Sequence, residues 1–117
     1  MNVTIYHNPR CSKSRKTLEL LIARGVSATV VEYLETPPDA QTLKSILTML
    51  EREPRDLMRT KEDVYRELDL SNVDLTAEEL IDAMVNNPIL IERPIVIAGG
   101  RAVVGRPPEN IAVLFPQ

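Results

Sequence analysis

The first third of the chain contains the pattern that most restricts its fold: a strand, a helix and a second strand within about 30 residues. β-Branched and aromatic residues predict the first strand over Val3–Tyr6. Apolar residues at helical spacing follow from Ser12 to a stop at Arg24–Gly25, and a second β-rich run predicts a strand over Thr29–Tyr33. A strand–helix–strand unit of this length requires parallel strands joined by a right-handed crossover.

The middle of the chain predicts an insertion made of helices. A helix that begins near Asp39 carries leucines and an isoleucine along one face. Thr76 stands three residues before Glu79, which is the spacing of a capping box at the start of a helix. Thr60 stands three residues before Asp63, a variant of the same box in which Asp replaces Glu or Gln. We therefore expect a helix to start at each of these positions.

The last third of the chain returns to strands. The segments PIVIA and RAVV flank Gly99–Gly100, a strong hairpin signal because glycine tolerates positive φ at both turn positions. A short helix over Glu109–Leu114 closes the chain. This order predicts the α/β class and a thioredoxin-like fold with a helical insertion between the strand–helix–strand unit and the C-terminal β-hairpin. Residues 1–117 are expected to form a single domain with one hydrophobic core.

Composition excludes several classes of partner. The net charge is −3 and the aromatic residues are three tyrosines and one phenylalanine, so we expect no nucleic-acid surface. No apolar run approaches the roughly 18 residues that a membrane span requires, so no membrane association is expected. No basic segment followed by a long apolar stretch is visible at the N-terminus, so no secretory signal is expected. A single cysteine excludes an intramolecular disulfide framework, which favours a reducing, cytoplasmic setting.

The segment HNPRCSKSR, residues 7–15, holds the chain's one histidine and its one cysteine, Cys11. Cys11 falls where the first strand passes into the first helix, and the unpaired N–H groups and dipole of a helix N-terminus favour an anion. Four cationic side chains surround it: Arg10, Lys13, Arg15 and Lys16. We expect this setting to lower the pKa of the thiol below about 8.5. Ser14 is a candidate hydrogen-bond donor to the sulfur, and His7 is a candidate cationic neighbour.

Several chemistries of a nucleophilic cysteine fail on spacing. A tyrosine-phosphatase loop requires arginine six positions after the cysteine, where this chain has Thr17, and a CxxC redox pair requires cysteine in place of Ser14. A protease dyad would have to use His7 from the same loop. An inert buried thiol is the other alternative, and the polar flanks argue against it. A single activated thiolate in an anion-binding loop remains, and it must complete a redox cycle with an external thiol.

Five segments resemble the glutaredoxin-coupled arsenate reductases, and they follow the order of that family along essentially the whole chain: HNPRCSKSRKTLELL, VVEYLETPP, LMRTKED, LIERPIVI and AVVGRPPE. The CSKS sequence resembles one subgroup of the family. The resemblance implies a thioredoxin-like fold and the reduction of arsenate to arsenite, a step in arsenic detoxification. It also implies glutathione as co-substrate and glutaredoxin as partner, with no metal and no tightly bound cofactor.

The resemblance assigns Cys11 as the nucleophile. It implies that Ser14 and His7 tune the thiol, and that Arg10 and Arg15 support it electrostatically. The mechanism it implies begins with attack of the thiolate on arsenate and ends with a mixed disulfide between the chain and glutathione, which glutaredoxin removes.

The resemblance also implies three oxyanion-binding arginines: Arg59, Arg93 and Arg106. Planar guanidinium groups suit this role because they match the oxygens of a tetrahedral anion in bidentate fashion. Pro94 matches the cis-proline position of thioredoxin-like folds. Arg101, beside the Gly–Gly turn, is interpreted as structural.

Two other functions remain open at this point. Spx-type transcriptional regulators resemble the same fold and bind RNA polymerase, but their usual CxxC switch is missing here. A glutathione-dependent thiol transferase would use the same cysteine. The three arginines argue against it only moderately, because phosphate and sulfate would fit the same set of guanidinium groups as arsenate.

Overall fold

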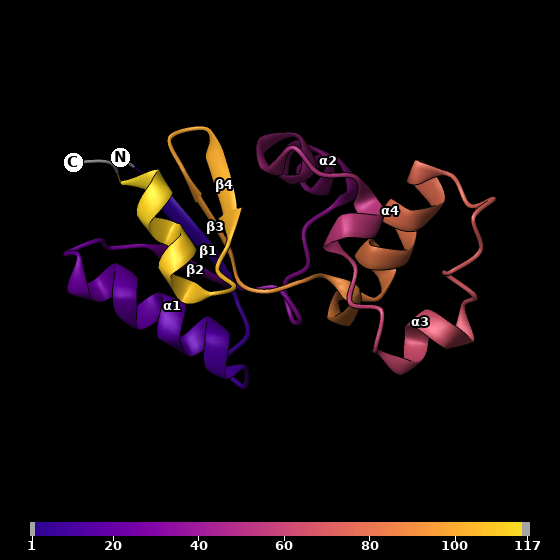
Figure 1. The fold of residues 1–117 in the computed structure, drawn as a ribbon, viewed down its shortest axis with the longest axis horizontal. Helices are drawn as coiled ribbons and strands as arrows, with labels where there is room; N and C mark the ends of the chain where they lie inside the picture. Colours follow the sequence, from indigo (N-terminus) through magenta and orange to yellow (C-terminus); the bar gives the residue numbers. More distant parts are fainter. Residues whose placement is uncertain (1, 116–117) are drawn as a thin grey trace. The chain divides into compact units, whose positions relative to one another are not determined.

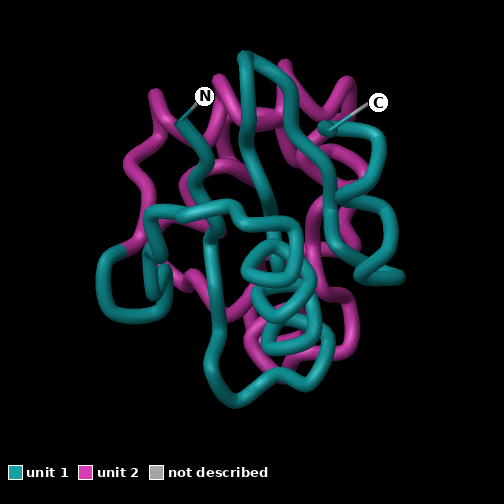
Figure 2. The backbone as a smooth tube through the Cα atoms, turned by 90° about the vertical axis from the view of Figure 1, so that its left-hand side faces the viewer, with its two compact units in different colours: residues 1–36, 93–117 teal, residues 37–92 magenta. Residues whose placement is uncertain are grey.

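The structure is a computed structural model that describes residues 2–115. The chain divides into two compact units (Figure 2): residues 1–36 with 93–117 form the first, and residues 37–92 form the second. The first unit therefore combines the two ends of the chain, and the second contains the helical insertion that the sequence predicts. None of the helices in the described part of the chain is long and apolar enough to cross a membrane.

The first unit is built on a four-stranded sheet with the order β2-β1-β3-β4 (Figure 1). Its strands are β1 (Val3–His7), β2 (Thr29–Glu32), β3 (Ile95–Ala98) and β4 (Arg101–Val104). β1 and β2 are parallel, whereas β1 with β3 and β3 with β4 are antiparallel. The parallel pair and the Gly99–Gly100 hairpin, with positive φ at both glycines, are confirmed. The α/β class is confirmed with them.

Helix α1 (Ser12–Ala23) and the 3₁₀ helix η3 (Pro108–Leu114) contact each other and share a core with the sheet. The core side chains are Val3, Ile5, Leu21, Val96, Ala98, Ile111 and Leu114. Buried and half-buried positions alternate along β1, and His7 takes the last buried position of the strand. The strand pattern therefore carries the imidazole into the interior just before the chain enters α1.

The second unit is helical. Its helices are α2 (Ala40–Leu50), η1 (Pro54–Leu57), α3 (Asp63–Glu67), α4 (Ala77–Asn86) and η2 (Pro88–Leu90). Asp39 caps α2 by accepting the N–H of Thr42 at 2.8 Å, and Thr76 with Glu79 forms the expected capping box of α4. Its buried side chains include Leu43, Ile46, Leu57, Leu80, Ile81 and Met84.

One predicted helix start is wrong. Helix α3 begins at Asp63 with Glu62 in the cap position, so Thr60 is not a helix cap. Arg59 donates to the carboxylate of Glu62 at 3.0 Å, and residues 60–61 form a turn before the helix. Smaller differences lie at element ends: β1 continues to His7, β2 stops one residue short of the expected end, and the closing helix has 3₁₀ geometry.

Candidate functional site

The loop that joins β1 to α1 is fixed by local hydrogen bonds. The carbonyl of Asn8 accepts the N–H of Cys11 at 3.0 Å, and the side-chain oxygen of Asn8 accepts the N–H of Arg10 at 3.0 Å. The guanidinium of Arg15 reaches back from α1 and donates to the carbonyl of Pro9 at 3.0 Å. These contacts hold Cys11 in an extended conformation as the residue that caps α1.

The thiol of Cys11 lies half-buried at the N-terminus of α1, a helix of 12 residues. Burial raises the pKa of Cys11, but the backbone N–H of Ser14, the guanidinium of Arg93 and the backbone N–H of Lys13 outweigh it, and the pKa is lowered from its ordinary value. The thiolate is the nucleophilic form of cysteine, so this setting favours reactivity. The groups that lower the pKa of Cys11 are therefore backbone N–H donors and Arg93. The sequence had suggested the cationic side chains next to Cys11 in the chain.

The side chain of Ser14 faces His7, whereas the sequence analysis placed it on the sulfur. Its Oγ lies 2.6 Å from Nδ1 of His7 and accepts the backbone N–H of Asn8 at 3.0 Å. Burial is the main influence on His7 and lowers its pKa, while Glu32 raises it and Arg15 lowers it further. The net lowering favours the neutral imidazole over the cationic neighbour that the sequence suggested. The reason is the buried position at the end of β1, which removes hydration from the ring.

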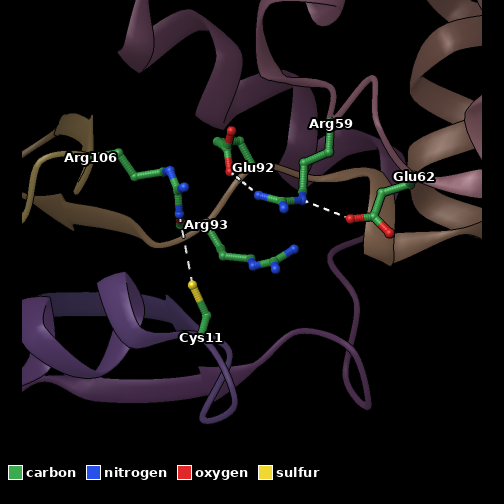
Figure 3. A network of polar contacts seen from close by, with 6 residues as sticks. All are labelled: Cys11, Arg59, Glu62, Glu92, Arg93 and Arg106. Carbon is green, nitrogen blue, oxygen red and sulfur yellow. Dashed lines mark hydrogen bonds and ion pairs between the residues drawn. The ribbon is translucent and has the colours of Figure 1, made fainter.

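Two arginines of the same unit lie beside the thiol (Figure 3). Nη1 of Arg106 is 3.8 Å from Sγ of Cys11 and 3.4 Å from the carbonyl oxygen of Arg93. The bond between Arg93 and Pro94 is cis, as the resemblance implies, and Arg106 forms a second cis bond with Pro107 that the sequence analysis did not predict. A thiol, two guanidinium groups and the first N–H groups of α1 therefore gather at one place, which suits attack by a thiolate on a bound oxyanion.

Gly105 brings the end of β4 close to α1. Its N–H donates to the carbonyl of Pro94 at 2.9 Å, and its carbonyl accepts the hydroxyl of Thr17 at 3.3 Å. A Cβ at position 105 would lie 2.6 Å from Oγ1 of Thr17 and 2.9 Å from Cγ of Pro94. A larger residue at this contact would force its neighbours to shift, so glycine allows the close approach that positions the next residue, Arg106. No local sequence pattern marks Gly105, because the contact joins segments far apart in the chain.

Arg59 belongs to the second unit, in the loop before α3. Its Nε donates to Glu62 at 3.0 Å and its Nη1 donates to Glu92 at 2.6 Å (Figure 3). Burial lowers the pKa of Arg59, but the two carboxylates outweigh it, and the net pKa is raised from its ordinary value. The guanidinium is thus a permanent cation with a fixed orientation. Its role in binding an oxyanion stays a prediction.

Comparison with known proteins gives the family. The sequence model of the ArsC family matches residues 6–114. The chain belongs to the ArsC family. It is 59% identical over 110 residues to the uncharacterized protein YfgD of Escherichia coli (strain K12), with 93% of this chain and 92% of the relative covered. It is 53% identical over 114 residues to a protein of Neisseria meningitidis serogroup A named arsenate reductase, with 97% of each covered.

A solved structure also matches this ArsC-family chain. The structure described as arsenate reductase from Vibrio cholerae has a TM-score of 0.96 and 47% sequence identity, and the match covers 98% of each chain. The thioredoxin-like fold expected from the sequence is confirmed by this likeness and by the sheet order.

Three further arginines of this ArsC-family chain differ in their surroundings. Arg15 is occupied with the carbonyl of Pro9, and Arg10 is exposed, so the electrostatic support expected from both stays a prediction. Arg101 donates to the carbonyl of Val113 at 3.0 Å, which agrees with its interpretation as structural.

Proposed function

We propose that this chain is an arsenate reductase that uses Cys11 as nucleophile, glutathione as co-substrate and glutaredoxin to regenerate the thiol. The observation that carries the proposal is the Cys11 thiol at the N-terminus of α1, with Nη1 of Arg106 3.8 Å from its sulfur and Arg93 lowering its pKa. Family membership and the names of the Neisseria meningitidis and Vibrio cholerae proteins support arsenate as the substrate.

Binding of arsenate would rely on charge and on the shape of the anion. Arsenate is tetrahedral and multiply charged, and a guanidinium group can donate two parallel hydrogen bonds to its oxygens. Arg93 and Arg106 are the donors beside the thiol, together with the first N–H groups of α1. Arg59 is the third arginine in this proposal, and Glu62 and Glu92 hold its guanidinium in one orientation.

In the first chemical step, the thiolate of Cys11 attacks arsenic. One sulfur–arsenic bond forms and one arsenic–oxygen bond breaks, and the departing oxygen takes up protons from solvent and leaves as water. Arsenic remains As(V) in the adduct. The positive groups around the thiol stabilise the charge that the adduct carries.

In the second step, glutathione supplies the reducing equivalents. Its sulfur bonds to arsenic and displaces another oxygen as water. A disulfide then forms between Cys11 and glutathione while both sulfur–arsenic bonds break, and an electron pair stays on arsenic, which becomes As(III) and is released as arsenite after adding water. In sum, one arsenate and two thiols give one arsenite, one mixed disulfide and one water.

The third step restores the thiol. The chain has a single cysteine, so no internal thiol can attack the mixed disulfide. The thiolate of glutaredoxin attacks the glutathione sulfur, takes over the glutathione and releases Cys11 as a thiolate. Glutathione and glutathione reductase then return glutaredoxin to its reduced form at the expense of NADPH.

The experiment that tests this proposal is arsenate-dependent oxidation of NADPH in the presence of glutathione, glutaredoxin and glutathione reductase. Cys11→Ser serves as the blank, and omission of glutaredoxin tests the coupling. We expect a rate that depends on arsenate, on Cys11 and on glutaredoxin. No rate above the blank would overturn the reductase assignment, and a rate that persists without glutaredoxin would overturn the coupling alone.

A further inference from the structure

An open pocket lies in the first unit where strands β1 and β2 end. It encloses about 250 Å³ and is lined by residues 7–10 of the loop before α1 and by Glu32, Leu34 and Glu35. His7 and Glu32 are register partners at the ends of these two parallel strands. In open α/β sheets, ligands bind in crevices at the carboxyl ends of parallel strands, so the pocket has the position of a binding site.

The turn after β2 brings a second carboxylate to the pocket. The N–H groups of Glu35 and Thr36 donate to the carbonyl of Glu32 at 3.0 and 2.9 Å. This turn folds the chain back, so that Glu32 and Glu35 both line the pocket. Arg10 lines it from the loop before Cys11. The pocket therefore carries two negative side chains and one positive side chain.

His7 contributes a hydrogen-bond donor from a buried residue. Its side chain is only 6% exposed, and Nδ1 lies 2.6 Å from Oγ of Ser14, which already accepts the N–H of Asn8. In the neutral imidazole with the hydroxyl of Ser14 donating to Nδ1, the ring proton is on Nε2. Within residues 2–115 the structure gives Nε2 no hydrogen-bond partner, although His7 lines the pocket. A ligand acceptor in the pocket would satisfy this donor.

The charges of the pocket select the chemistry of its ligand. A simple anion would face the carboxylates of Glu32 and Glu35. A metal ion is disfavoured, because the described residues contain no group of three or more His, Cys, Asp or Glu side chains able to hold one. A molecule with both an ammonium and a carboxylate group matches all the charges: the ammonium pairs with the glutamates, and the carboxylate pairs with Arg10 and Nε2–H of His7.

We propose that this pocket binds the α-amino acid head of the γ-glutamyl residue of glutathione, with its ammonium on Glu32 and Glu35 and its carboxylate on Arg10 and His7. This inference rests on the proposed function, in which glutathione is the second thiol. It assigns a place to the co-substrate, separate from the arginines that bind the oxyanion.

Size and reach agree with this assignment. Arg10 directly precedes Cys11, so their Cα atoms lie about 3.8 Å apart. In glutathione the peptide link to cysteine runs through the side chain of the glutamyl residue, so its reach is at least the roughly 7 Å that two extended α-linked residues span. The head group can therefore occupy the pocket while the thiol extends toward Cys11. A volume of about 250 Å³ is below the usual range of pockets for drug-sized ligands, which suits one end of a tripeptide better than the whole.

The direct test uses the chain's single histidine as a probe. S-methylglutathione, whose sulfur cannot react, is titrated into the protein while the ring-proton resonances of His7 are followed by NMR. We expect a saturable shift of these resonances. The matched ligand is N-acetyl-S-methylglutathione, which lacks the ammonium group and is expected to give no saturable shift over the same range. Equal shifts with both ligands, or no shift with either, would overturn the proposal.

Two variants test the same pocket by kinetics. In Glu32→Gln and Glu35→Gln, we expect the ratio of the KM for glutathione to the KM for 2-mercaptoethanol to rise roughly 2–5-fold, as for other exposed ion pairs. Glu19→Gln is the matched control, because Glu19 is an exposed glutamate of α1 that does not line the pocket. An unchanged ratio in both pocket variants would overturn the proposal.

The two proposals fail in different ways. If the protein binds S-methylglutathione at His7 but reduces no arsenate, the pocket assignment is supported and the proposed function fails. If arsenate is reduced with glutathione while His7 does not respond to S-methylglutathione, the function stands and the pocket assignment is overturned.

Discussion

Helices α1 and α4 begin in opposite ways. At the start of α4, the hydroxyl of Thr76 accepts the N–H of Glu79 at 3.1 Å, and the carboxylate of Glu79 accepts the N–H of Thr76 at 2.9 Å. The first turn of α4 also carries acidic side chains. At the start of α1, the side chain of Cys11 forms no capping hydrogen bond, and the first turn has no acidic residue.

The difference shows what a helix N-terminus can be used for. Every helix begins with N–H groups that lack partners within the helix, and with the positive end of its dipole. In α4 the chain satisfies these groups itself, which stabilises the second unit. In α1 they act on a thiol, whose pKa is lowered despite burial, and Arg106 adds a second positive group. The start of α1 therefore has no capping box, and its N–H groups instead stabilise the thiolate of Cys11.

The largest effect is expected from Cys11→Ser, which gives α1 a hydroxyl cap like that of α4. Arsenate turnover should fall to the level of the blank, because a serine hydroxyl is not ionised near neutral pH and the chain has no other thiol. The free energy of unfolding should stay equal or rise by up to about 1 kcal/mol, because serine is a preferred N-cap residue. Turnover measurements and chemical denaturation in slightly acidic buffer check both parts. Surviving turnover would refute Cys11 as the nucleophile.

The next largest effect is expected when lysine replaces an arginine of the proposed cradle: Arg59, Arg93 or Arg106. A point charge cannot reproduce the bidentate fork, so kcat/KM for arsenate should fall about 10–100-fold, equivalent to about 1.5–3 kcal/mol. Arg101→Lys is the matched control, since Arg101 contacts a backbone carbonyl. Wild-type kinetics in all three cradle variants would remove the oxyanion role of these arginines.

Gly105→Ala tests the packing that holds the end of β4 against α1. The added Cβ would meet Thr17 at 2.6 Å, so the neighbours must shift, and overpacking of this kind costs about 1–3 kcal/mol. We expect a lower free energy of unfolding and a higher KM for arsenate, because Arg106 follows Gly105 directly. Urea denaturation and kinetics measure the two effects. A variant with unchanged stability would show that this contact relaxes freely.

The elements with local signals were predictable from sequence. The parallel strand pair, the Gly99–Gly100 turn and the Thr76 cap each depend on a few neighbouring residues, and all are confirmed. Cys11 was recognised from its place between a strand and a helix. The cap expected at Thr60 failed although its spacing resembles that at Thr76, because α3 begins at Asp63 with Glu62 in the cap position.

Features set by tertiary contacts were not predictable. The pairing of Arg59 with Glu92 and the close approach of Gly105 to Thr17 join segments far apart in the chain. The lowered pKa of His7 follows from its burial at the end of β1, which the strand pattern alone does not give. Such contacts have no local periodicity, so only the folded structure assigns them.

Thr76→Ala removes the cap of α4 and makes its start resemble that of α1. We expect a loss of about 1 kcal/mol in the free energy of unfolding, the usual effect of removing a Thr cap. The rate of arsenate reduction should stay at the wild-type level, because the capping box of Thr76 and Glu79 contains none of the proposed site residues. Denaturation and the coupled assay measure these quantities together. A large loss of turnover with little loss of stability would contradict the assignment of this cap to stability alone.

The smallest effect is a pH dependence that the start of α1 should have and the start of α4 should lack. Alkylation of Cys11 should titrate with a midpoint below the ordinary value of a cysteine thiol, since the pKa of the thiol is lowered in the folded chain. Between that lowered pKa and the ordinary value, the unfolded chain binds more protons than the folded chain, so stability should rise with pH through this window. Cys11→Ser should lose that rise, whereas Thr76→Ala should keep it. Denaturation of the three proteins across the window measures the difference, and parallel curves for wild type and Cys11→Ser would mean that burial cancels the stabilisation of the thiolate.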